Sequence, residues 1–230
     1  MINVSVMVSG GGTNLQAIMD GIADGRIADG RVALVLSSRD GVYALSRAQS
    51  AGVKTVVISK EEYKDADKKA DAILAALSKA ETGLVITAGY MSVIHEKVCA
   101  AYAGRIINIH PALLPKFGGL GYYGLRVHRA VLEAGEAETG ATVHYVDTEG
   151  IDTGEIIMQR TVPVFADDTP ETLQKRVLEE VEHDLIVEAT ALVVRELAAA
   201  GPGDEAAKRI ARSDSDEAFE RGGENGNPVE

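Results

Sequence analysis

The sequence predicts an α/β fold, in which a mostly parallel, twisted sheet is flanked by helices. Short runs rich in β-branched residues alternate with longer stretches whose apolar residues recur at helical spacing. A glycine-rich turn separates the first of these runs from the first helical stretch. Because strands that alternate with helices usually pair in parallel, with helices on both faces, these observations predict one sheet covered on both sides.

The first half of the chain supplies the elements of this sheet in a regular order. Five buried strands are predicted over residues 2–8, 31–36, 54–58, 83–88 and 105–109. Four helices are predicted between them, over residues 14–22, 43–51, 61–77 and 93–102. This alternation is typical of a βαβ series.

The pattern changes after Pro111. A loop rich in Gly and Tyr, a helix and two strands are predicted over residues 115–124, 125–134, 139–146 and 155–164. A long helix then follows over residues 169–200. Asp168 or Thr169 can cap its first turn, and Pro170 suits a position at the start of a helix.

The composition is that of a soluble domain with a core, since 46% of the 230 residues are hydrophobic and 25% are charged. A formal net charge of −12 argues against nucleic-acid binding, which depends on many Lys and Arg contacts with phosphates. No stretch approaches the roughly 20 apolar residues of a membrane helix, and no basic segment precedes the first apolar run. A cytoplasmic protein without a membrane partner is therefore predicted. The single cysteine, Cys99, excludes an intramolecular disulfide and is predicted to lie in the core.

One domain over residues 1–200 and a tail over residues 201–230 are predicted. The tail carries eight acidic side chains against four basic ones. Its last residues are rich in Gly, Asn and Glu and offer little apolar area to bury. These features predict an acidic, disordered C-terminal tail.

The first motif is the turn Ser-Gly-Gly-Gly-Thr-Asn-Leu at residues 9–15. Glycines let the backbone approach a ligand closely, and the free N–H groups at a helix start favour an anion such as phosphate. A dinucleotide site is disfavoured, because Leu15 stands where the third glycine of that motif belongs. A tight turn without a ligand is the remaining alternative.

The second motif is Asn108-Ile109-His110-Pro111, at the predicted carboxyl end of the fifth strand. Side chains two residues apart on a strand share a face, so Asn108 and His110 are expected to point together. Ligands bind at this end of a parallel sheet, and an amide beside an imidazole suits oxyanion stabilisation and proton transfer. A polar strand end satisfied by loop backbone is the alternative for this motif taken alone.

Five motifs together resemble those of the phosphoribosylglycinamide formyltransferases, and they occur in the same order over about residues 1–195. They lie at residues 9–15, 108–116, 127–132, 139–144 and 152–159. The resemblance implies a Rossmann-like formyltransferase fold, with residues 1–200 as the catalytic domain. It also implies transfer of a formyl group from 10-formyltetrahydrofolate, as cosubstrate, to the amine of glycinamide ribonucleotide.

The resemblance also implies roles for individual residues. Asn108, His110 and Asp152 form the expected catalytic set, in which Asn108 and a protonated His110 stabilise an oxyanion while Asp152 relays a proton. Residues expected to bind the ribonucleotide are Gly11, Gly12, Thr13 and Asn14 at its phosphate and Glu182 near its amine. Residues expected to contact the folate are Met91, Ser92, Val93, Ile94, Asn108 and Lys60, the last in place of a common arginine.

The same resemblance leaves alternatives and marks two departures. Formyltetrahydrofolate hydrolase and other folate-dependent formyltransferases share the catalytic set and remain alternative functions. A monomer or homodimer with small-molecule substrates and no metal is expected. The chain is one residue longer than related sequences between His144 and Asp152, and its spacing from Arg176 to Glu182 differs from theirs by one residue.

Overall fold

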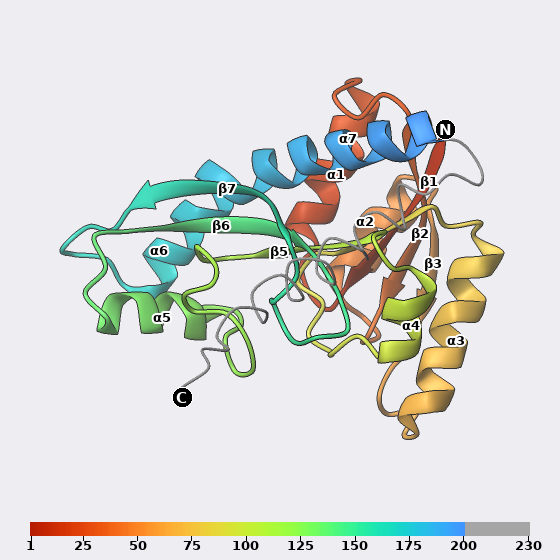
Figure 1. The fold of residues 1–230 in the computed structure, drawn as a ribbon, viewed down its shortest axis with the longest axis horizontal. Coiled ribbons are helices and arrows are strands. Elements are labelled where there is room, and N and C mark those ends of the chain that lie inside the picture. Colours follow the sequence, from red (N-terminus) through yellow and green to blue (C-terminus); the bar gives the residue numbers. More distant parts are fainter. Residues whose placement is uncertain (201–230) are drawn as a thin grey trace, which may run out of the picture.

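The computed structural model describes residues 1–200, and the predicted tail at residues 201–230 lies outside the described residues. One seven-stranded sheet runs through the molecule in the order β3-β2-β1-β4-β5-β6-β7 (Figure 1). The strands are β1 (Ile2–Val8), β2 (Gly30–Ser37), β3 (Lys54–Val57), β4 (Leu84–Thr87), β5 (Ile106–His110), β6 (Glu138–Tyr145) and β7 (Ile156–Pro163). The first five pair in parallel, whereas β6 pairs antiparallel with both of its neighbours, β5 and β7. The predicted mostly parallel sheet is confirmed.

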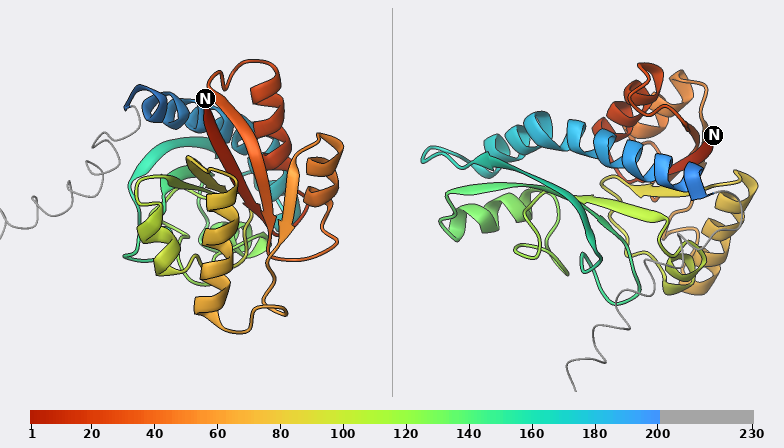
Figure 2. Two further views of the ribbon diagram at one scale, coloured as in Figure 1. Left: turned by 90° about the vertical axis from the view of Figure 1, so that its right-hand side faces the viewer. Right: turned by 45° about the horizontal axis from the view of Figure 1, so that its top comes forward.

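Helices cover both faces of this sheet. They are α1 (Thr13–Ala23), α2 (Tyr43–Ser50), α3 (Ala66–Lys79), α4 (Glu96–Ala101), α5 (Leu125–Glu133), α6 (Pro170–Val177) and α7 (His183–Ala200). Apolar residues of α1, α2 and α7 pack with one face of the sheet, and those of α3 and α4 with the other. Figure 1 shows α7 and α1 along the top of the molecule and α3 and α4 at its lower right, and Figure 2 shows the same arrangement from two other directions. Cys99 is buried, as predicted.

Three predicted helices differ from the observed ones at their ends or in their course. The helix predicted from residue 61 begins at Ala66, because the Asp65 side chain accepts a hydrogen bond from the Lys68 N–H and caps it there. The helix predicted over residues 93–102 is only Glu96–Ala101. The single long helix predicted after residue 169 is divided into α6, a π-helical turn at Leu178–Glu182, and α7.

The strand order places a crevice beside β1. From β1 the chain builds β2 and β3 on one side, then returns to add β4 on the other side. The loops that follow β1 and β4 therefore diverge at their carboxyl ends, where open parallel sheets bind ligands. The two loops are tied together, because the Met91 N–H donates a hydrogen bond of 2.8 Å to Ser9 Oγ.

Asp168 organises the start of α6 and supplies a prediction about pH. Its carboxylate accepts two short hydrogen bonds from Arg176, at 2.6 and 2.7 Å, and a third from the Phe165 N–H at 2.8 Å. The Arg176 bonds are the main reason that the pKa of Asp168 falls from 3.8 to about 2. A carboxyl whose pKa is lower in the folded state stabilises the fold above its unfolded pKa and loses this contribution as pH falls through the folded pKa.

We therefore expect Asp168→Asn to lower the free energy of unfolding at pH 7 by about 2 kcal/mol. The difference between variant and parent should shrink as the pH falls from about 4 to about 2, because the parent carboxylate then takes up its proton. Urea unfolding followed by circular dichroism across this range measures it. Equal stability of variant and parent at pH 7 would show that the Arg176 pair contributes nothing.

Candidate active site

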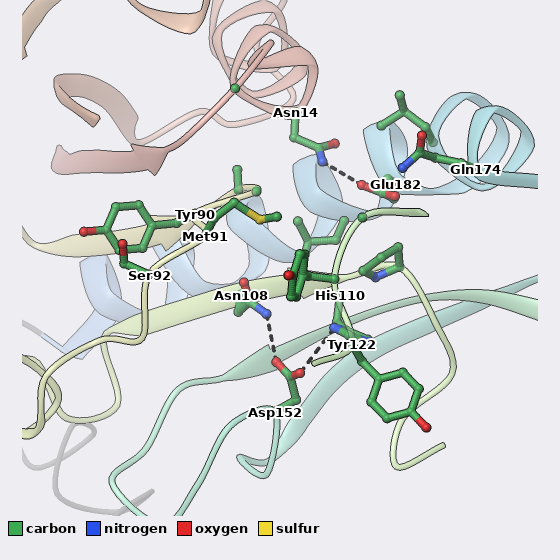
Figure 3. Close-up of a pocket in the computed structure, with 18 of the residues that line it drawn as sticks. Asn14, Tyr90, Met91, Ser92, Asn108, His110, Tyr122, Asp152, Gln174 and Glu182 are labelled. Atoms are coloured by element: carbon green, nitrogen blue, oxygen red, sulfur yellow. Dashed lines mark hydrogen bonds and ion pairs between the residues drawn. The ribbon is translucent and has the colours of Figure 1, made fainter. Parts of the chain in front are cut away.

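A pocket of about 590 Å³ occupies this crevice, within the usual size of a small-molecule site. Its walls come from the loops after β1, β4 and β5, the loop at residues 119–124, the loop after β6, and the helical segment 174–182. Figure 3 shows Asn108 and His110 near the centre, Tyr90 to Ser92 on one side, and Glu182 with Gln174 on the other. Segments distant in the sequence thus meet around the second motif.

The glycines of the first motif have different tasks. Gly12 has a φ of 73°, and a Cβ atom there would lie 2.6 Å from the Cβ atom of Ala44 on α2. Its lack of a side chain is therefore needed for backbone conformation and packing. An added Cβ atom at Gly10 or Gly11 meets nothing within 4 Å, and both residues line the pocket. These two positions leave open space at the start of α1.

Asn108, His110 and Asp152 converge, as the second motif and the resemblance predict. Asp152 Oδ2 lies 3.3 Å from His110 Nδ1, and Asp152 Oδ1 lies 3.4 Å from Asn108 Nδ2. The Thr87 hydroxyl donates a 2.6 Å hydrogen bond to Asn108 Oδ1, which directs the amide NH2 group toward Asp152. Thr87 on the neighbouring strand β4 thus orients the amide, and the loop after β6 brings the carboxylate to both the amide and the imidazole.

The loop after β6 holds Asp152 in an uncommon conformation. Its φ is 60°, a left-handed value that Asp tolerates better than most residues, and its Oδ2 atom accepts the Gly119 N–H at 3.0 Å. Burial raises the pKa of Asp152, but its contacts with His144, His110 and the Gly119 N–H lower the pKa more strongly. The carboxyl is consequently ionised at neutral pH. The additional residue in this loop does not prevent Asp152 from reaching the site.

His110 is buried, and both of its ring nitrogens face acceptors. Nε2 lies 2.8 Å from the Phe117 carbonyl oxygen, and Nδ1 faces Asp152. Burial lowers the pKa of His110, and the opposing effects of Asp152 and the Phe117 carbonyl do not fully offset it. Desolvation of the ring thus outweighs the nearby carboxylate and favours the neutral imidazole, and the stabilisation of an oxyanion by a protonated His110 stays a prediction. A proton that reaches the ring nevertheless finds an acceptor at each nitrogen.

His144 completes the polar cluster from the neighbouring antiparallel strand. It pairs with Asn108 in the β5–β6 register, and its Nε2 atom lies 3.1 Å from Asn108 Nδ2. Its Nδ1 atom lies 2.7 Å from the Tyr145 carbonyl oxygen, and its Nε2 atom also lies 3.5 Å from Asp152 Oδ1. His144, at the end of the motif at residues 139–144, thus contacts Asn108 directly.

Asn14 and Glu182 meet on the side of the pocket that lies across from Asp152, as Figure 3 shows. The Asn14 amide donates a 2.7 Å hydrogen bond to Glu182 Oε2, and both side chains are buried. Burial raises the pKa of Glu182, although the Asn14 bond opposes this effect. The one-residue difference in spacing between Arg176 and Glu182 falls at the π-helical turn Leu178–Glu182, which holds one residue more than an α-helical turn, and Glu182 faces the pocket.

The residues predicted to contact folate do not all line the pocket. Met91, Ser92 and Val93 do, in the loop after β4. Ile94 instead packs with the core beneath α3 and α4, and Lys60 is exposed in the turn after β3. Neither Ile94 nor Lys60 is part of the pocket wall, so a role for either in binding folate stays a prediction.

Several lining residues were not assigned to the site from the sequence. Arg39, from the loop after β2, is the one Lys or Arg among the described residues of the pocket wall. Tyr122 and Gln174 come from segments without a recognised motif. His128 is buried, and burial lowers its pKa to about 4, so its ring is neutral at pH 7. Among these residues, only Arg39 had a position that the sequence could have indicated, because it follows the second strand directly and so lies at the carboxyl edge of the sheet.

No group of three or more His, Cys, Asp or Glu side chains within residues 1–200 is arranged to hold a metal ion. No helix in the described part of the chain is long and apolar enough to span a membrane.

A pocket at the carboxyl ends of parallel strands, with an amide, an imidazole and a carboxylate at its centre, is the arrangement expected for a group-transfer enzyme. A family model described as formyl transferase matches residues 2–190. The chain therefore belongs to the formyl transferase family.

Within that family, several similar proteins are named phosphoribosylglycinamide formyltransferase. The Haemophilus influenzae enzyme of that name is 37% identical over 180 residues, which are 78% of this chain and 82% of that protein. The chloroplastic enzyme of Arabidopsis thaliana is 42% identical over 194 residues, which are 84% of this chain but 65% of that relative's length. A crystal structure of glycinamide ribonucleotide transformylase 1 from Symbiobacterium toebii is 43% identical, with a TM-score of 0.79 over 85% of this chain and 89% of that one. The resemblance inferred from the motifs is confirmed.

Proposed function

We propose that this protein transfers the formyl group of 10-formyltetrahydrofolate to the amine of glycinamide ribonucleotide, forming formylglycinamide ribonucleotide and tetrahydrofolate for purine synthesis. The observation that carries the proposal is the convergence of Asn108, His110 and Asp152 in one pocket beside a glycine loop. The similarity to enzymes named for this reaction supports it. The reaction itself needs no electron carrier, because no atom changes oxidation state.

The first step is attack of the neutral amine on the formyl carbon. A C–N bond forms, and the carbonyl electrons move to oxygen, which becomes an oxyanion. The Asn108 amide is suited to stabilise this oxygen, because its 3.4 Å contact with Asp152 is long enough to be exchanged for a stronger one. Thr87 holds the amide oxygen during this exchange.

The second step moves one proton from the attacking nitrogen to the leaving N10 nitrogen of the folate. A neutral His110 is ready to take up this proton, and Asp152 stabilises the imidazolium that results. Collapse of the oxyanion then breaks the bond to N10, and the proton passes to that nitrogen, directly or through water. The atoms balance, because the amine loses one hydrogen and tetrahydrofolate gains it.

The two substrates divide the pocket. We assign the phosphate of the ribonucleotide to Gly11, Gly12, Thr13 and Asn14, with Arg39 supplying positive charge nearby. Glu182 faces the remainder of the ribonucleotide from the π-helical turn at Leu178–Glu182. Met91, Ser92 and Val93 then face the pterin, and Met91 and Val93 are suited to supply apolar contacts.

A formyltetrahydrofolate hydrolase would use the same three residues with water as the nucleophile. Steady-state deformylation of 10-formyltetrahydrofolate, with and without glycinamide ribonucleotide, separates the two functions. We expect turnover to depend on the ribonucleotide. An equal rate in buffer alone would favour the hydrolase, and a rate dependent on another amine would indicate a different formyltransferase.

The open space at Gly11 supplies a test of the phosphate site. Gly11→Val adds a side chain where no protein atom lies within 4 Å, so the fold should tolerate it while phosphate loses its close approach. We expect the KM for glycinamide ribonucleotide to rise about tenfold or more, by the worth of charge-assisted hydrogen bonds, with an unchanged Tm.

Gly12→Val is the matched comparison. Its Cβ atom would collide with Ala44 and its φ is left-handed, so we expect a clear loss of stability in this variant. An unchanged KM in folded Gly11→Val would contradict the phosphate assignment.

A further inference from the structure

Arg47 of α2 has no role in the steps above and is not part of the pocket wall, yet it contacts the glycine loop from the side of α2. Its Nε atom donates a hydrogen bond of 2.9 Å to the Gly11 carbonyl oxygen, and its Nη1 atom donates one of 3.1 Å to Gln16 Oε1 on α1. Its guanidinium carbon lies 4.7 Å from the centre of the Tyr43 ring. These three contacts hold the half-buried guanidinium group against the loop.

Two successive carbonyl groups of the glycine loop face α2. The Ala44 N–H donates a 3.1 Å hydrogen bond to the Gly10 carbonyl oxygen, and Arg47 binds the Gly11 carbonyl oxygen. In a trans peptide unit the C=O group and the following N–H group point in opposite directions. The N–H groups of Gly11 and Gly12 therefore point away from α2, and neither donates to a backbone carbonyl within residues 1–200.

These N–H groups extend an anion site that begins at α1. Successive N–H groups on one side of a turn make a concavity that binds anions, and they add to the unpaired N–H groups with which an α-helix begins. Glycine on both sides of the Gly11–Gly12 peptide unit gives this unit unusual conformational freedom. A fixed orientation of the Gly12 N–H therefore depends on a bond to the Gly11 carbonyl oxygen, which is the bond that Arg47 supplies.

We propose that Arg47 is a positioning residue, which orients the Gly11–Gly12 peptide unit so that the Gly12 N–H is directed at the phosphate of the ribonucleotide. This inference rests on the proposed function, which assigns the phosphate to this loop. The role differs from that of Arg39, whose side chain lines the pocket and supplies charge. Because Arg47 acts through a peptide unit, its hydrogen-bond donor matters more than its charge.

Two neutral replacements separate the donor from the charge. The amide nitrogen of Gln is bonded to Cδ, as Nε is in Arg, so Arg47→Gln retains a donor at the same place along the side chain, whereas Arg47→Met has none. We expect Arg47→Met to raise the Kd for glycinamide ribonucleotide about tenfold, the worth of one hydrogen bond to a charged group, and Arg47→Gln to raise it less than about threefold. Calorimetric titration of proteins with an unchanged Tm measures both.

The effect should be confined to the phosphate. We expect Arg47→Met to leave unchanged the Kd for the ribonucleoside, which lacks the phosphate, and kcat at saturating ribonucleotide. Arg105→Met is the matched control, because Arg105 donates a 2.8 Å hydrogen bond to the Ala101 carbonyl oxygen and lies 4.9 Å from the Tyr102 ring centre, outside the pocket wall. It removes the same charge and should leave the Kd for the ribonucleotide unchanged.

Each outcome has a separate meaning. Equal losses of ribonucleotide affinity in Arg47→Met and Arg47→Gln, or in Arg47→Met and Arg105→Met, would reduce the effect to charge and overturn the proposal. If Arg47→Met does not fold, Arg47→Lys replaces it, and a smaller loss in Arg47→Lys than in Arg47→Gln would overturn the proposal in the same way. Unchanged affinity in folded Arg47→Met, in a parent that binds the ribonucleotide more tightly than the ribonucleoside, would overturn this inference alone. A parent that binds the two compounds equally tightly would overturn the phosphate assignment in the proposed function as well.

Discussion

Asp152→Asn is expected to lower kcat by a hundredfold or more and to leave the KM for glycinamide ribonucleotide nearly unchanged. The substitution removes the charge 3.3 Å from His110 Nδ1, so the ring has no counter-ion when it takes up the amine proton. The backbone should be preserved, because Asn tolerates the left-handed φ of 60° at this position. Steady-state kinetics together with a thermal melt of the variant measures both parts.

Two other acids in the same loop are the controls. Asp147 accepts hydrogen bonds from the Glu149 N–H at 2.9 Å and the Thr153 hydroxyl at 3.2 Å, so it organises the loop without touching the central cluster. Glu149 is exposed. We expect Asp147→Asn and Glu149→Gln to cost less than tenfold in kcat, since neither removes a positioned acid–base group. An inactive Asp147→Asn beside a nearly fully active Asp152→Asn would reassign the catalytic carboxylate.

Asn108→Asp should have an effect of similar size for a different reason. The new side chain has nearly the same shape and can still accept the 2.6 Å hydrogen bond from Thr87, but both amide hydrogens are lost. It also places a second carboxylate against Asp152. Loss of one oxyanion donor typically costs a hundred- to a thousandfold, so we expect kcat to fall by at least about a hundredfold.

Thr87→Val separates orientation of the amide from its presence. This variant keeps the Asn108 amide and removes the hydroxyl that fixes its direction. We expect a smaller loss, of about fivefold to twentyfold in kcat, corresponding to one hydrogen bond. If Asn108→Asp retains more activity than Thr87→Val in folded protein, the amide is not the group that stabilises the oxyanion.

The parts of the site that local sequence determines were predictable. Asn108 and His110 point together because alternate strand residues share a face, and the glycine loop lies between a strand and a helix because of its own composition. The parallel strands were also predictable from local sequence, because a strand buried on both faces requires a continuous apolar run.

The remaining features depend on distant parts of the chain. The contact between His144 and Asn108 arises from the antiparallel register of β5 and β6, and the support of Asp152 comes from the Gly119 N–H, 33 residues away. The neutral state of His110 follows from its burial, which the sequence does not reveal. The π-helical turn that ends at Glu182, beside Asn14, was not predicted either, because the sequence indicated a single helix over residues 169–200.

The most direct measurement follows the carbon atom itself. The protein is incubated with 10-formyltetrahydrofolate labelled with ¹³C in the formyl group, together with glycinamide ribonucleotide, and the products are observed by ¹³C NMR. We expect the label to appear in the formamide of formylglycinamide ribonucleotide, and Asp152→Asn to slow this appearance without redirecting it. Appearance of the label as formate, at the same rate with or without the ribonucleotide, would contradict the proposal that this protein is a transferase.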